Sequence, residues 1–293
     1  MRQASSGEVV RVGALIDAAN RLEPLSASVA RLIDLLADSD VDLRDIVEVI
    51  SFDPLLTASM LRAANSATSS SVRPVTTVHD AVIRTGTGTV LSLALNASVS
   101  GRLRAPVPGY DTVEGEMWGH SVTAALAAET LAGWSRLAVP AGAPAAALLH
   151  DIGKLVLAQT VSPHMLQLIG RTATTEGRPL TDVETTVLGI NHGQVGGLVA
   201  LHWRLPESIS EAIINHHVSR SHTGALAQVV YLAQAVAHDL DRVAEEGAAG
   251  IEQRASEPVD PVPLIALGIE PERYHELLVT TQQRYALLSV RFS

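Results

Sequence analysis

The eight residues Ala147-Leu148-Leu149-His150-Asp151-Ile152-Gly153-Lys154 decide how the rest of this chain has to be arranged. They follow an alanine-rich run and place an imidazole beside a carboxylate in an otherwise apolar stretch. The two carboxylate oxygens of Asp151 can serve one metal ion or two neighbouring ones. A His-Asp pair alone is most often an ordinary polar pair at a helix end. The pair therefore indicates a metal site only if other segments bring further ligands to it.

The composition predicts an all-α fold. Hydrophobic residues make up 47% of the 293 residues and aromatic residues only 3%, and the apolar residues are mainly alanine, leucine and valine. This mixture favours packed helices over sheets, and no alternation typical of strands persists along the sequence. The chain has no cysteine, so neither disulfides nor thiolate metal sites are expected.

The segment Pro106-Val107-Pro108-Gly109 is the predicted boundary between two helical subdomains, residues 1–108 and 109–293. Before this boundary, Thr77 and Asp80 are spaced as in a capping box and predict a helix start. After it, apolar periodicity predicts helices over about Val113 to Ala132, residues 143 to 161 (one helix or a pair), Thr181 to Gly189, His192 to Trp203, Glu207 to His217, Ala225 to Leu240 and about Pro271 to Leu287. The polar, proline-bearing residues from Asp241 to Pro263 predict a loop.

The formal net charge of −10 argues against two classes of partner. Affinity for nucleic acid comes largely from cations that neutralise phosphates, so DNA and RNA are not expected partners. An acidic surface repels anionic membranes for the same reason. No stretch approaches the roughly 20 apolar residues that span a bilayer, and the first residues lack the apolar core of a signal peptide. A cytoplasmic protein is therefore expected.

Further nitrogen and oxygen ligands lie at spacings that helices can bring to the His-Asp pair. Glu116 and His120, for example, are four residues apart and share a face on a helix. Five imidazoles and two carboxylates can line one bundle interior, as they do in di-metal carboxylate proteins. The candidate metal ligands are Glu116, His120, His150, Asp151, His192, His216 and His217.

The expected cofactor is a divalent transition metal, as one ion or two. Nitrogen and oxygen ligands without sulfur suit iron, manganese or zinc. In a two-ion centre Asp151 would bridge the metals, and Lys154, three residues on, could stabilise charge on a phosphoryl oxygen. Asp151 and Lys154 are therefore the candidate catalytic residues. Lys154 is also the only lysine of the chain, and a compact ammonium is the better point charge for phosphate.

Each of these features also has an ordinary structural explanation. A single helix histidine is usually hydrogen-bonded or exposed, and a Glu and His four apart are usually a solvated pair. The histidines without a partner at ligand spacing, which we interpret in this way, are His79, His164, His222 and His275. Three hypotheses stay open: a signalling module that binds a partner, a metal-dependent phosphohydrolase, and a scaffold in which the histidines have no role.

Blocks of sequence along most of the chain carry a resemblance to a known family. In the first half they are Leu25-Ser26, Asp53-Pro54-Leu55, Leu61-Arg62-Ala63-Ala64-Asn65-Ser66-Ala67 and Asp80-Ala81-Val82 with Gly86. In the second half they are Trp118-Gly119-His120-Ser121, Leu148 to Lys154, Gly189-Ile190-Asn191-His192, Gly196, Trp203-Arg204-Leu205-Pro206 and Ile213 to His217. Over roughly residues 20 to 240 the chain resembles the HDOD domain, an output-type relative of the HD superfamily of metal-dependent phosphohydrolases.

The resemblance implies two helical subdomains, of which the second, residues 109–293, is similar to an HD hydrolase core with a C-terminal helical extension. HDOD domains are regarded as degenerate HD domains that act in bacterial signal transduction by binding partners or ligands. The expected partner of this chain is therefore a signalling protein or a small nucleotide.

The HD-GYP phosphodiesterases, which cleave cyclic di-GMP, are catalytic relatives that this sequence resembles at every candidate ligand and at Lys154. It departs from them in two places. The segment after His217 reads Val-Ser-Arg-Ser-His-Thr-Gly and lacks their Gly-Tyr-Pro signature, and Gln234 stands where they place a last metal-binding aspartate. His238, one turn on, or Asp239 could replace that aspartate. These departures favour a signalling role over cleavage of cyclic di-GMP.

Overall fold

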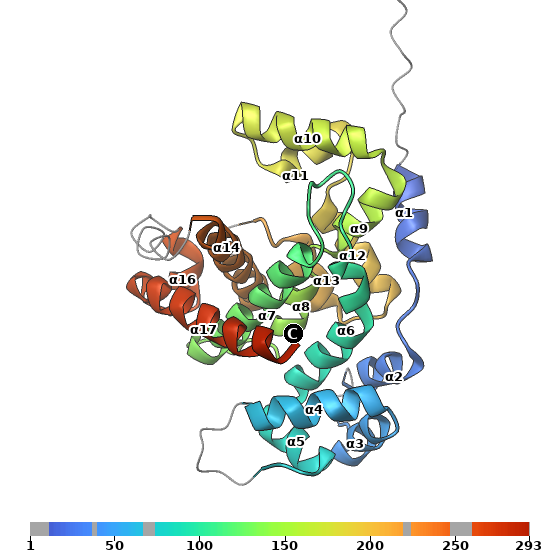
Figure 1. Ribbon diagram of the computed structural model, residues 1–293, viewed down its shortest axis with the longest axis vertical. Coiled ribbons are helices and arrows are strands. Elements are labelled where there is room, and N and C mark those ends of the chain that lie inside the picture. Colours follow the sequence, from blue (N-terminus) through green and yellow to red (C-terminus); the bar gives the residue numbers. More distant parts are fainter. Residues whose placement is uncertain (1–11, 37–39, 67–73, 219–223, 247–259, 293) are drawn as a thin grey trace, which may run out of the picture.

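The computed structural model describes residues 12–36, 40–66, 74–218, 224–246 and 260–292. Every regular element in these ranges is helical, which confirms the prediction of an all-α fold (Figure 1). The elements are α1 (Val12–Arg21), α2 (Ala27–Leu36), α3 (Leu43–Ser51), α4 (Pro54–Ser66), α5 (Val78–Thr85), α6 (Thr87–Arg104), α7 (Glu116–Trp134), α8 (Ala143–Leu149), α9 (Ile152–Thr160), α10 (Pro163–Glu176), α11 (Leu180–Leu188), α12 (His192–His202), α13 (Glu207–Ile214), α14 (Ala225–Glu246), α16 (Pro261–Ala266), the 3-10 helix η1 (Pro271–Arg273) and α17 (Tyr274–Phe292).

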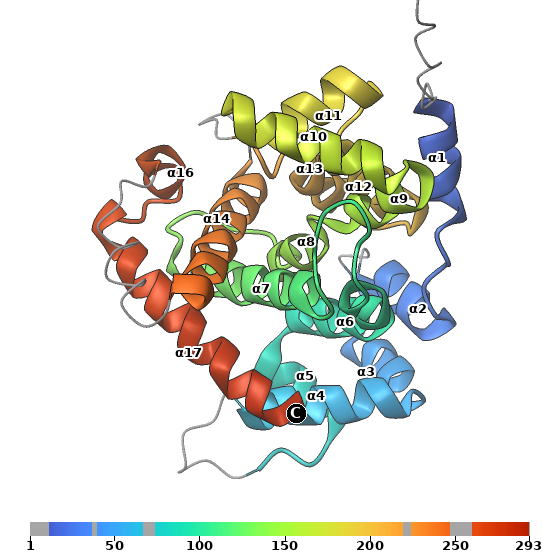
Figure 2. The same cartoon turned by 45° about the horizontal axis from the view of Figure 1, so that its top comes forward.

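Helix α6 lies between two groups of helices (Figures 1 and 2). It contacts α2, α4 and α5 in the first group, and α7, α8 and α9 in the second. The connection from α6 to α7, residues 105–115, contains the predicted boundary at residues 106–109. That boundary stays a prediction. Helix α1, although it comes first in the chain, packs against α9 and α12 of the second group.

Local sequence sets the helix starts that matter for the site. The side chain of Thr77 accepts a hydrogen bond from the backbone N–H of Asp80, as their spacing predicts. At the start of α12, Asn191 and Gln194 form a complete capping box. Each side chain accepts from the other residue's backbone N–H, which satisfies two amides that a helix start leaves unpaired. The cap therefore fixes His192 as the first residue of α12.

Helices α8 and α9 form the buried centre of the second group. The sequence allowed either one helix or a pair of helices over residues 143 to 161, and the structure contains a pair. The alanines at 143, 145, 146 and 147 are fully buried. Their small side chains let α8 pack against α6, α7, α13 and α14 at once. On α9, a Cβ atom at Gly153 would lie 2.0 Å from the carbonyl oxygen of His192 and 2.7 Å from the backbone nitrogen of Gly196. The backbones of α9 and α12 therefore touch at Gly153.

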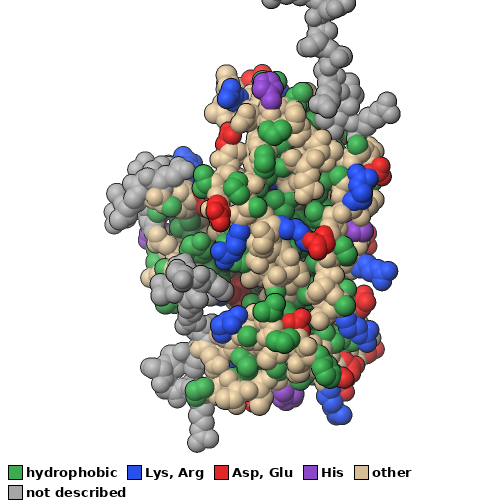
Figure 3. Space-filling view, turned by 45° about the vertical axis from the view of Figure 1, so that its right-hand side comes forward, with side chains coloured by type: hydrophobic (Ala, Val, Ile, Leu, Met, Phe, Trp, Pro, Cys, Tyr) green, Lys and Arg blue, Asp and Glu red, His purple; other side chains and the backbone are tan. Residues whose placement is uncertain are grey.

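The described surface carries charges of both signs. On the face shown in Figure 3, Lys and Arg side chains are interspersed with Asp and Glu, and no broad area has a single sign. Within the described residues, no helix combines the length and the apolar character needed to cross a bilayer.

We expect Gly153→Ala to destabilise the fold by about 2 kcal/mol or more, because backbone atoms of α12 cannot move aside for a methyl group. Urea denaturation measures the effect. Gly170→Ala on α10 is the matched control, since a Cβ there meets nothing within 4 Å. The control should be neutral or more stable by about 0.5–1 kcal/mol, because alanine favours helix. Equal stabilities for the two variants would contradict the contact between α9 and α12.

Candidate metal centre

His150 and Asp151 occupy the junction between α8 and α9. His150 follows the last residue of α8, and Asp151 immediately precedes α9. Both are buried, at 0% and 3% exposure. The Nζ atom of Lys154, in the first turn of α9, lies 2.7 Å from Oδ2 of Asp151. The break between the helices thus places a carboxylate and an ammonium inside the bundle.

Histidines from α7, α12 and the turn after α13 converge on Asp151. Oδ1 of Asp151 lies 3.4 Å from Nε2 of His192 and 3.8 Å from Nε2 of His216. Oδ2 lies 3.4 Å from Nε2 of His150 and 3.9 Å from Nε2 of His120. The two oxygens therefore face two different sets of imidazoles.

Two groups with metal-ligand geometry result, and they share Asp151. One joins the carboxylate to His192, His216 and His217, and the other joins it to His120 and His150. Within each group the candidate ligand atoms all lie within 4.8 Å of one another. Each group therefore has the ligand types and the spacing that could hold a metal ion, with one oxygen of Asp151 facing each group.

Four of the imidazoles are oriented through Nδ1, each beside an acceptor that cannot donate. The acceptors are the carbonyl oxygen of Ala147 for His150 (2.7 Å), that of Ile213 for His216 (2.6 Å), the carboxylate of Glu184 for His192 (2.7 Å) and that of Asp241 for His120 (2.6 Å). In the neutral form of each ring, Nδ1 therefore carries the proton and the lone pair sits on Nε2, which faces Asp151. Such outer hydrogen bonds fix the tautomer of metal-binding histidines.

The facing Nε2 atoms of two histidine pairs are close enough to share a cation. For His192 and His217 an ordinary hydrogen bond is the alternative, because the neighbouring acceptors fix the tautomer of His192 but not that of His217. Nε2 of His120 lies 3.1 Å from Nε2 of His150, and Nε2 of His192 lies 2.9 Å from Nε2 of His217. Two lone pairs at this distance repel each other unless a proton or a metal ion is shared. Neighbouring ligands of a metal with bonds of about 2.0–2.1 Å lie about 2.9–3.4 Å apart, so these spacings fit a metal ion.

Unsatisfied buried atoms at Asp151 and His216 support the same conclusion. Oδ1 of Asp151 and Nε2 of His216 are both buried and have no hydrogen-bond partner among the described residues. Burial, followed by the neighbouring His217, lowers the pKa of His216 well below 6.5, so the ring stays neutral and keeps its lone pair. Burial raises the pKa of Asp151, but the charge of Lys154 and the His150 ring outweigh it and hold the pKa well below the ordinary value. An ionised carboxylate and a neutral imidazole suit a metal ion.

A third group joins α14 to His120 of α7. The expectation of a loop from Asp241 to Pro263 was wrong for residues 241–246 and 261–263, which are helical, whereas residues 247–259 lie outside the described residues. Helix α14 continues to Glu246, so His238 and Asp241 lie three residues apart on one face and reach His120. The sequence suggested His238 or Asp239 as a replacement for the aspartate that Gln234 displaces. Of these two, His238 lies near the candidate metal centre. The other, Asp239, accepts a hydrogen bond from the hydroxyl of Tyr274 instead. Gln234 is buried on α14.

Glu116 is the one candidate ligand that the described structure does not bring to Asp151. It is exposed in the first turn of α7, and its carboxylate accepts from the backbone N–H of Val113 at 2.8 Å. This hydrogen bond to the turn before α7, together with the positive end of the helix dipole, explains the position of the carboxylate. Its role as a ligand stays a prediction, as does the role of the other six. His79, His164 and His275 are exposed and outside the three groups, and His222 lies outside the described residues.

Sequence reasoning missed the carboxylate that orients His192. Glu184 on α11 is fully buried, accepts from both the backbone N–H and Nδ1 of His192, and accepts from the hydroxyl of Tyr110 at 2.8 Å. Burial raises its pKa, but His192 outweighs burial and lowers it below the ordinary value. The signal available in the sequence was weak: one glutamate eight residues before a candidate ligand.

Comparisons with known proteins agree with this architecture. The family model of the HDOD domain matches residues 22–219. A curated relative from Treponema pallidum, named as an uncharacterised protein, is 25% identical over 203 residues, and the match covers 68% of this chain but 39% of the relative. The chain therefore spans well under half the length of that relative.

Solved structures of similar proteins cover nearly the whole chain. A candidate phosphohydrolase from Shewanella amazonensis is 25% identical with a TM-score of 0.67, and the match covers 94% of this chain and 98% of that one. An HDOD domain protein of unknown function from Geobacter sulfurreducens is 22% identical with a TM-score of 0.68, covering 94% and 97%. A candidate signal transduction protein from Marinobacter aquaeolei is 24% identical with a TM-score of 0.69, covering 96% and 64%. The last two show the fold alone.

We expect the purified protein to bind about two divalent metal ions per chain, as measured by elemental mass spectrometry after metal addition and dialysis. Asp151→Ala should lose both ions because both groups share its carboxylate, whereas His217→Ala should lose about one. His202→Ala is the control, because His202 is exposed at the end of α12 and outside the three groups. Full metal content in Asp151→Ala would refute the shared centre.

The metal-free protein should lose stability as the pH falls below about 6.5. The pKa of His216 is lowered in the folded state, so the unfolded chain binds more protons below its ordinary value of 6.5. Unfolding therefore becomes easier by up to about 1.4 kcal/mol per pH unit for this residue. Urea denaturation at pH 7.5, 6.5 and 5.5 measures the slope, which should be shallower for His216→Asn. An identical slope in that variant would contradict a buried neutral imidazole.

Proposed function

Since this chain belongs to the HDOD domain family, we propose that it is a signal-transduction output module whose His/Asp centre holds divalent metal and binds the phosphate of a regulatory nucleotide. The match of the family model to residues 22–219 confirms the resemblance to the HDOD domain that the sequence predicts. The observation that carries the proposal is the carboxylate of Asp151, whose two oxygens face two separate sets of imidazole nitrogens.

The residues present fit a pair of metal ions. His192, His216 and His217 would hold one ion with Oδ1 of Asp151, and His120 and His150 would hold the other with Oδ2. Ligands of nitrogen and oxygen suit iron, manganese or zinc. Bound ions supply positive charge that attracts and polarises phosphoryl oxygens. The centre would thus give an acidic chain one local site for an anion.

Lys154 adds a fixed positive charge of the protein itself. Its ammonium is held by Asp151 and lies 5.8 Å from the centre of the Tyr110 ring. The hydroxyl of Tyr110 donates to Glu184, which in turn orients His192. The side chain of Lys154 keeps 18% exposure, whereas the side chains of His150 and His192 are fully buried. Lys154 therefore lies at the solvent side of the centre, where a phosphate would enter.

Hydrolysis of a phosphodiester is the second candidate function, and the contact between Asp151 and Lys154 favours it. An ammonium beside a metal-binding carboxylate can stabilise charge that develops on a phosphoryl oxygen. The likeness to a candidate phosphohydrolase from Shewanella amazonensis supports the same chemistry. Gln234 in place of a metal-binding aspartate and the absence of a Gly-Tyr-Pro segment after His217 favour the signalling role.

Isothermal titration of the metal-loaded protein tests the proposal, with cyclic di-GMP, linear dinucleotides and nucleoside monophosphates as probes. Lys154→Met should weaken binding of the preferred nucleotide about tenfold at unchanged metal content, and Lys154→Arg should weaken it less, because charge-assisted hydrogen bonds contribute about 1.5–3 kcal/mol. Absence of binding by every nucleotide at millimolar concentration would refute the nucleotide proposal. Chromatography of the same mixtures detects products, and turnover abolished by Asp151→Ala would establish the second candidate instead.

A further inference from the structure

The connection between α6 and α7, residues 105–115, is a closed loop with hydrogen bonds of its own. It extends from these two helices toward α10 and α11 (Figures 1 and 2). At its base the backbone N–H of Gly115 donates to the carbonyl oxygen of Arg104 at 2.8 Å. Within it the backbone N–H of Val107 donates to the hydroxyl of Thr112 at 2.9 Å. This segment, which we call the connector, therefore has a defined shape.

The connector packs against α10 through the residues on either side of Tyr110. Gly109 has a φ angle of 90°, and a Cβ atom there would lie 2.6 Å from Cβ of Leu166. Asp111 has a φ angle of 53°, which is uncommon for a residue other than glycine. Its carboxylate accepts a hydrogen bond from the side chain of Gln167 at 2.9 Å. Both flanking residues are thus held on α10, and they fix the position of Tyr110 between them.

Tyr110 links the connector to a candidate metal ligand through two consecutive hydrogen bonds. Its hydroxyl donates to Oε1 of Glu184 at 2.8 Å. Oε2 of the same carboxylate accepts from Nδ1 of His192 at 2.7 Å and from its backbone N–H at 2.9 Å. Glu184 and His192 are fully buried, so solvent cannot replace the hydroxyl if it is removed. The hydroxyl therefore helps to hold Glu184 where it directs Nε2 of His192 toward Asp151.

The second set of imidazoles is oriented without the connector. His150 is oriented by the carbonyl oxygen of Ala147, and His120 by the carboxylate of Asp241 on α14. Neither acceptor belongs to residues 105–115. A change in the connector should therefore act on an ion held with His192 and not on an ion held by His120 and His150.

We propose that Tyr110 is a positioning residue through which the connector sets the metal affinity of the group that contains His192. This inference rests on the proposed function only in that the centre holds metal. Coupling free energies are reciprocal, so an ion in this group also stabilises the connector in its docked position. Helix α6 contacts both groups of helices and leads into the connector, so the metal state of the centre is transmitted to the junction between them.

Calorimetric titration of the metal-free protein with Mn²⁺ tests the effect on affinity. Tyr110→Phe removes the hydroxyl but keeps the ring, whose centre lies 5.8 Å from Nζ of Lys154. It should weaken binding of one of the two ions about tenfold, as loss of an outer hydrogen bond does, and leave the other unchanged. Gly109→Ala should weaken the same ion, because the added methyl group displaces the connector from α10. Wild-type affinity for both ions in Tyr110→Phe would overturn the proposal.

Two comparisons separate positioning from a general loss of stability. Tyr274→Phe removes a similar bond, from the hydroxyl of Tyr274 to the carboxylate of Asp239 at 2.7 Å, and should leave the affinity for both ions unchanged. His217→Ala should keep only the ion of the other group, so adding Tyr110→Phe should have no further effect. An equal loss of affinity in Tyr274→Phe, or a further loss in the His217→Ala background, would overturn the assignment of Tyr110.

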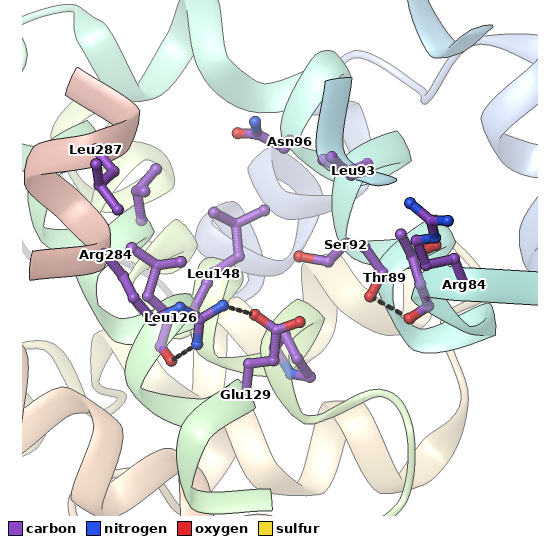
Figure 4. Close-up of a pocket in the computed structure, with 15 residues that line it drawn as sticks. Arg84, Thr89, Ser92, Leu93, Asn96, Leu126, Glu129, Leu148, Arg284 and Leu287 are labelled. Atoms are coloured by element: carbon purple, nitrogen blue, oxygen red, sulfur yellow. Dashed lines mark hydrogen bonds and ion pairs between the residues drawn. The ribbon is translucent and has the colours of Figure 1, made fainter. Parts of the chain in front are cut away.

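Hydrogen exchange followed by mass spectrometry tests the reciprocal effect. Saturating Mn²⁺ should slow exchange of the backbone amides in residues 107–115 about threefold or more in the wild type, and less in Tyr110→Phe. Residues 280–287 of α17 are the internal reference, because they belong to none of the metal-binding groups. Arg284 joins this helix to Glu129 and to the carbonyl oxygen of Leu126 on α7 (Figure 4). Equal slowing in both segments would show a global effect and overturn the coupling.

The metal content of the wild type separates this inference from the proposed function. A wild-type protein that binds no divalent ion would overturn both. Two bound ions whose affinities do not depend on Tyr110 would overturn only the role of the connector.

Discussion

The burial of one ionised carboxylate, that of Asp151, is the constraint on which the rest of the structure depends. A charge at 3% exposure is unstable unless other groups compensate it. Lys154 supplies a full positive charge at 2.7 Å, and imidazole nitrogens surround the remaining directions. Those imidazoles come from α7, α12 and the turn after α13. The carboxylate therefore ties together helices that are far apart in the sequence.

A second layer of acceptors makes the arrangement specific. Backbone carbonyls and two carboxylates, those of Glu184 and Asp241, hold the Nδ1 atoms of four histidines so that each Nε2 points inward. Turning any one ring would break a hydrogen bond and leave a buried polar atom unpaired. Metal binding and folding are coupled in such a centre, because an ion stabilises only the folded state in which the ligands already meet.

Helix α8 connects the packed core of the second helical group to the candidate metal centre. Its buried alanines allow neighbouring helices to approach from several directions, and His150 follows its last residue directly at the candidate metal centre. Close packing means that a change of volume on one side of α8 is felt on the other. The short, alanine-rich segment therefore belongs to the core of the fold and also positions His150 at the candidate metal centre.

The sequence by itself determined the all-α class, the family and the residue types of the centre, because ligand chemistry is carried by side-chain identity and helical periodicity by apolar spacing. It predicted the candidate ligands without any structure, among them His120, His150, Asp151 and the three later histidines His192, His216 and His217. Only the tertiary structure decided which of these candidates meet. Glu116 shares a helix face with His120 but is the first residue of α7, where its carboxylate accepts a hydrogen bond from the backbone N–H of Val113 and stays exposed. Asp241 and Glu184 were not identified, because the end of α14 and the packing of α11 depend on contacts that no local pattern specifies.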